Sequence, residues 1–292
     1  MKIKTECVPC LVKRVIFESE QSTSDVEKKV CALRSACKML SEIYDPDTCS
    51  AEIATKIHKK VYEILEDSDP YFKLKQQSNI VAHQLVSRVE TYIQTAEDSL
   101  KASMLCSIIG NSMDYGIEGA SNNAEMLLDV FDAMYEKGLG YDDYSKVIAY
   151  LKKAKKIVLF TDNCGEIVFD KILCRQIKKS FPHLFITLVV KGEPVLSDAT
   201  KIDAEQLHFS EVVDEIVTTG CFAVGVDFSQ LPKKLENVLR DCDLIICKGM
   251  ANYESFSETS YHPIAYLLRT KCTAIAKSMD LPVNSNIIKL YE

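Results

Sequence analysis

The chain has 292 residues, of which 47% are hydrophobic and 26% are charged, and its formal net charge at pH 7 is −7. This is the composition of an ordinary globular protein, long enough for one large domain or two smaller ones. The sequence has neither the ~18 to 20 consecutive apolar residues of a membrane helix nor a basic stripe that would hold a phosphate backbone, so we expect neither a membrane nor a nucleic-acid partner.

The N-terminal segment MKIKTECVPCLVKR has charges and a cysteine pair where a secretory signal would have an unbroken apolar stretch, which favours a cytoplasmic location. Without an export signal, the 12 cysteines are more typical of free thiols or metal ligands than of a disulfide framework. Six of them lie among apolar neighbours and are interpreted as small buried hydrophobic residues: Cys31, Cys37, Cys106, Cys174, Cys242 and Cys247.

Up to about residue 150 the apolar residues recur every three or four positions, which is the spacing of amphipathic helices. One apolar stripe from Val81 to Ile108 predicts a single long helix. Segments 24–43, 50–66 and 122–136 have the same period. We therefore predict a mainly helical N-terminal region over residues 1–145.

Further along the chain, short apolar runs alternate with helical segments, a pattern typical of a parallel sheet with crossover helices. The expected strands cover residues 157–160, 184–190, 214–218, 243–248 and 264–269. Residues 146–292 are therefore predicted to form a Rossmann-like, three-layer α/β/α domain. Two glycines in the segment KGLGYDDY mark the boundary before it.

Each expected strand is followed by a polar or glycine-containing loop, and ligands of open parallel sheets bind beyond the carboxyl ends of the strands. Asp162 and Asn163 follow the first expected strand, and Asp198 follows the second. Carboxylate and amide oxygens suit Mg²⁺ or Mn²⁺. Gly165 would let the backbone and the next helix N-terminus approach an anion. A metal beside an anion site indicates a phosphorylated ligand.

These residues also have purely structural interpretations. Asp162 or Asn163 could cap the next helix, with Glu166 completing a capping box. Asp198 could belong to a loop that enters its own helix, and Lys248 could be a solvated lysine at a strand end. The functional interpretation therefore depends on the loops meeting at one edge of the sheet.

Better-known motifs do not fit the sequence. It has no GxGxxG dinucleotide fingerprint, and although Gly220 and Gly225 have P-loop spacing, Val226 and Asp227 stand where that loop needs lysine and a hydroxyl residue. The DCD at 241–243 precedes its expected strand, whereas an aspartyl-phosphatase DxD follows one. Five histidines lack zinc-protease spacing and are interpreted as surface or packing residues: His58, His83, His183, His208 and His262.

Seven motifs occur in order: CVPC at 7–10, DPYFKLKQQSN at 69–79, IIGNSMDYG at 108–116, TDNCGE at 161–166, PVLSDAT at 194–200, KGMANYE at 248–254 and LRTKC at 268–272. Together they resemble the damage-control phosphatases, the ARMT-like metal-dependent family formerly described as a domain of unknown function, in its archaeal branch with a cysteine pair. The resemblance covers nearly the whole chain. It implies a helical region packed on a Rossmann-like domain and hydrolysis of phosphate monoesters with a divalent ion.

The resemblance also implies the residues of the site. Its metal ligands and catalytic residues would be Asp162, Asn163 and Asp198. The substrate pocket would be lined by Asn111, Glu166, Lys248, Asn252 and Lys271, with Asp114 in the same motif as Asn111. The cation would hold phosphate oxygens, and a lysine would add positive charge. Asp162 would either orient the attacking water or attack directly.

The implied cofactor is Mg²⁺, Mn²⁺, Co²⁺ or Ni²⁺, and the implied partner is a small phosphorylated metabolite. That metabolite would be a sugar phosphate, a cofactor intermediate or a nucleotide, in keeping with metabolite damage control. Two other functions remain open: a carboxyl methyltransferase that uses S-adenosylmethionine, although the first loop is not glycine-rich, and a non-catalytic protein that binds a metal or a phosphorylated metabolite.

Cys7 and Cys10 have the spacing of both a zinc half-site and a redox pair. Only six residues precede the pair, which does not suit a thioredoxin motif. A structural zinc completed by Cys272 and a set of unpaired thiols both remain possible. Two further positions depart from the family pattern: the segment Cys221–Phe222 stands where small polar residues are expected, and Ser197 where asparagine is frequent.

Overall fold

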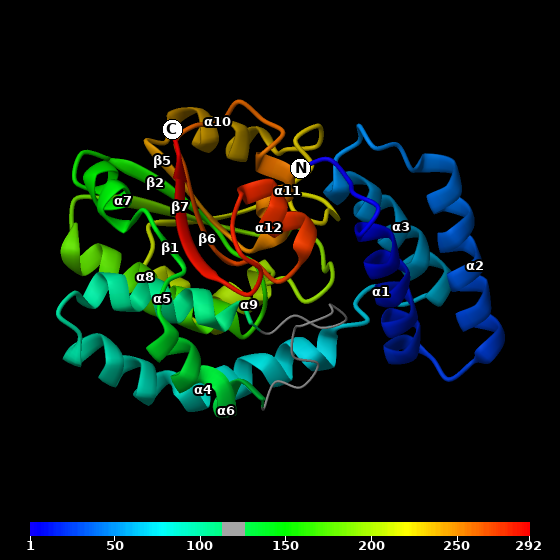
Figure 1. Ribbon diagram of the computed structural model, residues 1–292, viewed down its shortest axis with the longest axis horizontal. Coiled ribbons are helices and arrows are strands. Elements are labelled where there is room, and N and C mark those ends of the chain that lie inside the picture. Colours follow the sequence, from blue (N-terminus) through cyan, green and yellow to red (C-terminus); the bar gives the residue numbers. More distant parts are fainter. Residues whose placement is uncertain (113–125) are drawn as a thin grey trace.

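A seven-stranded sheet forms the centre of the protein in a computed structural model that describes residues 1–112 and 126–292 (Figure 1). Its strands are β1 (Tyr141–Asp142), β2 (Lys156–Phe160), β3 (Phe185–Val190), β4 (Glu215–Thr218), β5 (Leu244–Lys248), β6 (Ile264–Arg269) and β7 (Asn286–Tyr291). The helices are α1 (Cys7–Ser22), α2 (Val26–Ile43), α3 (Ser50–Leu65), α4 (Phe72–Thr95), α5 (Ser99–Gly110), α6 (Met126–Lys137), α7 (Tyr144–Leu151), α8 (Glu166–Ser180), α9 (Lys201–Gln206), α10 (Lys233–Asp241), α11 (Met250–Phe256) and α12 (Thr273–Met279).

The strand order is β1-β7-β6-β5-β2-β3-β4. From β2 the chain moves outward to β3 and β4, then returns to place β5 on the other side of β2, with parallel pairing on both sides of β2. The strand order therefore reverses between β2 and β5, and open α/β sheets bind ligands in the crevice at such a reversal. The α/β class and all five expected strands are confirmed.

Beyond β6 the sheet is not parallel, because β7 runs antiparallel to β6 and pairs Arg269 with Asn286. Strand β7 and the short strand β1 were not among the predicted strands. The connection from β6 to β7 contains α12, and its first and last residues lie next to each other. Thr270 N donates to Ser285 O (3.0 Å) and Asn284 N donates to Thr270 O (2.6 Å). The segment is therefore a closed loop rather than a crossover.

Both faces of the sheet are covered, as the predicted three layers require. Successive residues of a strand point to opposite faces. On β2, Ile157 and Leu159 share a core with α4, α5 and α8, whereas Val158 and Phe160 share a core with α10, α11 and α12. Strands buried on both faces read as continuous apolar runs, which is why β2 appears in the sequence as KIVLF.

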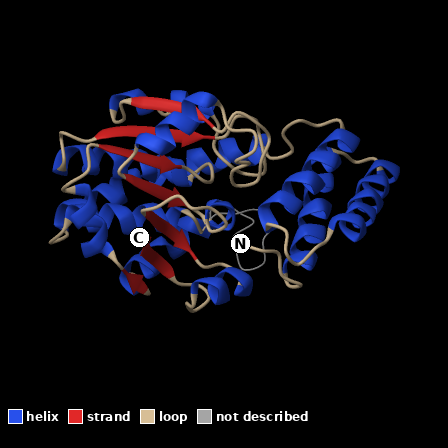
Figure 2. Cartoon of the chain, turned by 90° about the horizontal axis from the view of Figure 1, so that it is seen from above, coloured by secondary structure: helices blue, strands red, loops and turns tan. Residues whose placement is uncertain are grey.

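Helices α1, α2 and α3 form a three-helix unit to one side of the α/β body (Figures 1 and 2). Its own apolar core extends to Val195, Leu196, Phe222 and Val224, which lie in the loops after β3 and β4. The unit is therefore docked on the edge of the sheet where the strands end. The helices predicted at 24–43 and 50–66 are confirmed as α2 and α3.

The prediction of one helix from Val81 to Ile108 is wrong, because the segment is divided between α4 and α5. The backbone of Ala96 leaves the helical conformation, and the Asp98 carboxylate accepts a hydrogen bond from Lys101 N (3.0 Å), which caps α5. Both helices pack on the same core, so the apolar stripe continues across the break. Of the helix predicted at 122–136, the part before residue 126 lies outside the described residues.

The predicted burial of cysteines is wrong for Cys31 and Cys37, which are exposed on α2, and Cys242 is only half-buried. This helix buries only the face that carries Ala32, Ala36 and Leu40.

The division at residue 145 stays a prediction, and α4 and α5 share their core with the sheet. Among the described residues, none of the helices combines the length and the apolar character needed to cross a bilayer.

Candidate functional site

The loops after β2 and β3 lie side by side and are joined through their backbones. Ala199 N donates to Asp162 O (2.8 Å), and Asn163 and Asp198 form an isolated antiparallel bridge. The side chains of these three predicted ligands are all buried, with exposed fractions of 2–5%. Backbone contacts therefore place three oxygen-bearing side chains together, next to the point where the strand order reverses.

The interpretation of Asp162 or Asn163 as a helix cap with Glu166 is wrong, whereas Asp198 does lie in the loop that enters α9. Helix α8 has Gly165 as its N-cap, with φ +84°, and no side chain caps it. Asn163 N donates to the Glu166 carboxylate at 3.3 Å, so only one half of the capping box forms. Helix α9 has its own capping box, which begins at Thr200, two residues after Asp198. Neither loop therefore uses its predicted ligands to start a helix.

Hydrogen bonds fix the side chains of the first loop. Asp162 Oδ2 accepts from Asn111 Nδ2 and from Asn163 Nδ2, both at 2.8 Å. Ser197 Oγ donates to Asn163 Oδ1 at 2.6 Å, so the serine that departs from the family pattern holds the predicted amide ligand. An amide oxygen has two lone pairs, and Ser197 uses one of them.

Asp198 in the second loop is paired with Lys191, whose Nζ lies 3.2 Å from Asp198 Oδ2. Both side chains are buried. Lys191 Nζ also donates to the backbone carbonyls of Ala223 and Gly225, so this lysine joins the loops after β3 and β4. Lys191 was not among the predicted site residues, although its position directly after β3 was a signal that could have identified it.

These residues fit a hard divalent cation. Two carboxylates and one amide supply oxygen donors only, which is the chemistry that Mg²⁺ and Mn²⁺ prefer. A cation would also offset the two adjacent negative charges of Asp162 and Asp198. Within residues 1–112 and 126–292, no three His, Cys, Asp or Glu side chains are gathered as a ready-made metal site, and here the third oxygen comes from an amide.

A cavity of about 510 Å³ lies beside this oxygen cluster. Four residues predicted for the site line it: Asp162, Asn163, Asp198 and Lys271. Another part of its wall comes from the three-helix unit and includes Cys7, Cys10, Arg14 and His58. The cavity therefore lies between the strand ends and helices α1 and α3, and a ligand at the oxygen cluster would also meet the helical unit.

Lys248 at the end of β5 is fully buried, so its interpretation as a solvated lysine is wrong. Its Nζ is paired with Glu166, lies 2.7 Å from Asp170 Oδ1 and donates to Ser107 O (3.2 Å). Burial disfavours the charged lysine, but the Asp170 and Glu166 carboxylates outweigh it and raise the pKa of Lys248. Burial raises the pKa of Asp170 to about 6 despite the neighbouring lysine.

Four residues predicted for the substrate pocket are buried and do not line this cavity: Asn111, Glu166, Lys248 and Asn252. Asn111 Nδ2 donates to Glu166 (2.6 Å) as well as to the first loop, and Asn252 Nδ2 donates to Thr161 O (2.9 Å). In this structure these four buried residues support the loop after β2 on the side away from the cavity. Their contact with substrate stays a prediction, and Asp114 lies outside the described residues.

The sequence of the chain matches the family model of the damage-control phosphatase ARMT1-like domain over residues 3–287. The chain belongs to the damage-control phosphatase family. The matched region contains all seven motifs and the whole oxygen cluster. The resemblance drawn from those motifs is thereby confirmed.

Relatives of this damage-control phosphatase family member come from archaea. A damage-control phosphatase from Archaeoglobus fulgidus is 36% identical over 292 residues, which is 100% of both chains. A damage-control phosphatase from Pyrococcus horikoshii is 26% identical over 282 residues, covering 97% of this chain and 96% of the relative. The crystal structure of a DUF89 family protein from Pyrococcus horikoshii has the same fold, with a TM-score of 0.89, 25% identity and 100% coverage of both chains.

Gly249 gives this family member space for its oxygen cluster. It follows β5 with φ +73°, and a Cβ atom there would lie 1.9 Å from Asp162 Oδ2. Gly249→Ala is therefore expected to displace the Asp162 carboxylate and weaken divalent-cation binding measured by calorimetry, in addition to a backbone strain of about 1–3 kcal/mol, because φ +73° with ψ +169° is a conformation essentially restricted to glycine.

Gly138→Ala is the matched control, because Gly138 has φ +69° and a Cβ there would meet nothing within 4 Å. Both variants should lose stability from backbone strain, Gly249→Ala should lose more because only its Cβ clashes, and only Gly249→Ala should lose cation binding. Equal cation binding in the two variants would show that Gly249 has no role in the site.

The three cysteines predicted for zinc all line the cavity of this family member: Cys7, Cys10 and Cys272. Cys7 and Cys10 lie in the first turn of α1, and Cys272 Sγ accepts a hydrogen bond from Ile275 N (3.5 Å) at the start of α12. Burial raises the pKa of Cys7 to about 11, which opposes the thiolate form that zinc and redox chemistry require. Structural zinc at these three cysteines stays a prediction.

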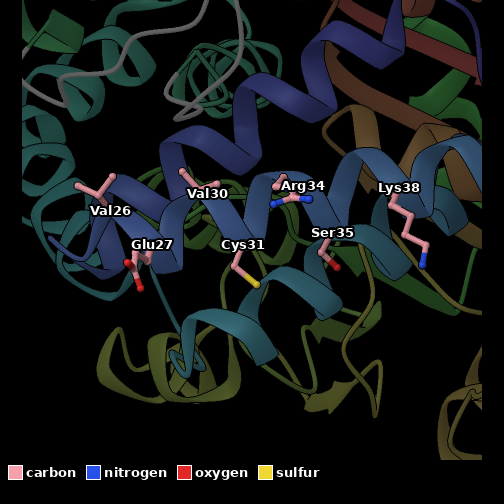
Figure 3. A pocket seen from close by; sticks show the side chains of 7 residues that line it. All are labelled: Val26, Glu27, Val30, Cys31, Arg34, Ser35 and Lys38. Carbon is pink, nitrogen blue, oxygen red and sulfur yellow. The ribbon is translucent and has the colours of Figure 1, made fainter.

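A separate hollow of about 630 Å³ lies on α2, away from the oxygen cluster (Figure 3). All the side chains that line it come from this one helix: Val26, Glu27, Val30, Cys31, Arg34, Ser35 and Lys38. It is the outer face of a helix rather than a cleft between elements. It brings no carboxylates together, and we assign it no function in this family member.

Proposed function

We propose that this chain is a divalent-metal-dependent phosphatase that hydrolyses phosphate monoesters of small metabolites. The observation that carries the proposal is the buried cluster of Asp162, Asn163 and Asp198, which lines a cavity together with Lys271 at the ends of β2, β3 and β6. The relatives from Archaeoglobus fulgidus and Pyrococcus horikoshii are named damage-control phosphatases, which supports the same activity.

The residues of the chain would bind and orient the phosphate. A divalent cation held by Asp162, Asn163 and Asp198 would neutralise charge on the phosphate oxygens. Lys271 on the same cavity wall would add a positive charge, and Asp162 would orient the attacking water. Positioning and electrostatic stabilisation supply most of the catalysis in phosphoryl transfer. This set of residues provides the types of group that such catalysis requires.

The size of the cavity limits the substrate. A volume of about 510 Å³ is typical of a pocket for a small molecule. Sugar phosphates, phosphorylated cofactor intermediates and nucleotides are therefore the substrate classes that we propose, in line with a role in metabolite damage control.

Release of inorganic phosphate from a panel of these substrates tests the proposal. The wild-type protein is stripped of metal and assayed with Mg²⁺, Mn²⁺, Co²⁺, Ni²⁺ or EDTA. We expect turnover with at least one cation and its loss in EDTA. Turnover that is unchanged in EDTA would remove the metal from the proposal, and binding of S-adenosylmethionine without any phosphate release would replace it with the methyltransferase.

A further inference from the structure

A buried pair of ionisable side chains joins helices α1 and α3 at the cavity wall. His58 Nδ1 lies 2.8 Å from Glu18 Oε1 and 3.0 Å from Glu18 Oε2. The exposed fractions are 1% for His58 and 0% for Glu18. His58 lines the cavity together with Asp162 and Asp198. From its sequence context, this histidine was interpreted only as a surface or packing residue.

The second ring nitrogen of His58 is available to a ligand. Glu18 occupies Nδ1, and within the described residues Nε2 has no hydrogen-bond partner. Because His58 lines the cavity and Glu18 holds Nδ1, Nε2 is the ring nitrogen left to face the cavity space. Glu18 therefore fixes the ring with Nε2 as the nitrogen that a bound molecule would meet.

Two hydrogen bonds anchor helix α3 to the loops that carry the site, one on each side of His58. One turn after His58, Tyr62 Oη accepts a hydrogen bond from Leu196 N (3.1 Å). Leu196 precedes Asp198 by two residues. Three residues before His58, Thr55 Oγ1 accepts from Val224 N (2.9 Å), and Leu196 and Val224 both line the cavity. His58 is thus held next to the loop that carries a proposed metal ligand.

A carboxylate bound to one nitrogen of a histidine fixes the orientation of the ring and directs its other N–H group. This arrangement suits general acid catalysis, which typically contributes about 10²–10⁴-fold to a rate. The proposed reaction has such a need, because an alkoxide is a poor leaving group. No other residue assigned above supplies a proton to it.

We propose that His58 is a further catalytic residue, the general acid for the leaving group, and that Glu18 is its positioning residue. This inference rests on the proposed phosphatase function. The attacking water forms a new P–O bond and the ester P–O bond breaks. The electron pair of the broken bond goes to the leaving oxygen, which takes the proton of His58 Nε2. The proton that the water releases returns to His58, so the products are inorganic phosphate and the alcohol.

The test compares two leaving groups in His58→Gln. p-Nitrophenyl phosphate releases a stable phenolate that needs little protonation, whereas a sugar phosphate releases an alcohol that needs it. For His58→Gln we expect kcat to fall about 10²–10⁴-fold with the sugar phosphate and less than about 10-fold with p-nitrophenyl phosphate. Glu18→Gln should show the same selectivity with a smaller loss.

Tyr62→Phe is the control, because it removes a neighbouring buried hydrogen bond without removing an acid, and it should affect both substrates equally. Equal losses for both substrates in His58→Gln would overturn the inference and leave the phosphatase function standing. Should His58→Gln fail to fold, the wild type decides. In the wild type, a kcat that is nearly independent of the pKa of the leaving alcohol or phenol supports His58 as the general acid. A kcat that falls steeply as that pKa rises overturns the inference. A wild type inactive on every substrate of the panel, with each of the four cations, would refute the proposed function itself.

Discussion

Lys248→Met is expected to lower the free energy of unfolding by about 3–5 kcal/mol, the cost of removing one partner from a buried ion pair. The Lys248 ammonium is the cation paired with both Glu166 and Asp170, and all three side chains are 0% exposed. Without it, two buried carboxylates are left without the cation that pairs with them. Urea unfolding at pH 7 measures the loss.

Lys201→Met is the matched control, because Lys201 is 60% exposed and forms only a surface pair with Glu205. It should change the unfolding free energy by less than about 0.5 kcal/mol. Neutralising the two carboxylates in the Lys248→Met background, with Glu166→Gln and Asp170→Asn, should recover part of the stability. A loss below about 1 kcal/mol in Lys248→Met would show that the network does not stabilise the fold.

Asp162→Asn is expected to lower metal-dependent phosphate release by about 10²-fold or more, the scale of removing one preorganised electrostatic group from an active site. The substitution removes a negative charge and keeps the shape of the side chain. The asparagine carbonyl can still accept the hydrogen bonds that Asn111 and Asn163 donate to Oδ2. The thermal unfolding temperature should therefore stay close to that of the wild type.

Asp241→Asn serves as the control for this substitution. Its side chain is 57% exposed at the end of α10, and it belongs to the DCD segment that precedes β5. It should retain the full rate of phosphate release. If Asp162→Asn kept more than half of the wild-type rate, the cluster of Asp162, Asn163 and Asp198 would not be the site of phosphate release.

The strands and the strand-end residues could be predicted from the sequence because both are local. A buried parallel strand is a short apolar run, and the polar residues that follow it, such as Asp162 and Asp198, are placed by the fold at one edge of the sheet. The break between α4 and α5 could not be predicted from the sequence, because a single apolar stripe continues across it. The direction of β7 was hidden because it depends on Thr270 and Ser285 meeting across a closed loop.

The remainder of the site depends on contacts between residues far apart in the sequence. Glu18 and His58 meet only because α1 and α3 pack together, and their apolar periodicity gives no sign of the pair. The burial of Lys248 depends in the same way on Asp170, which lies inside α8. The family resemblance indicated that Lys248 belongs to the site but not that it lies behind the cavity wall.

Calorimetric titration of the metal-stripped protein with Mn²⁺ tests the central claim most directly, namely that the loops after β2 and β3 hold a divalent cation. We expect saturable binding in the wild type and in Asp241→Asn, and no binding in the double variant Asp162→Asn/Asp198→Asn. Wild-type affinity in a folded double variant would contradict the account and place the cation elsewhere in the molecule.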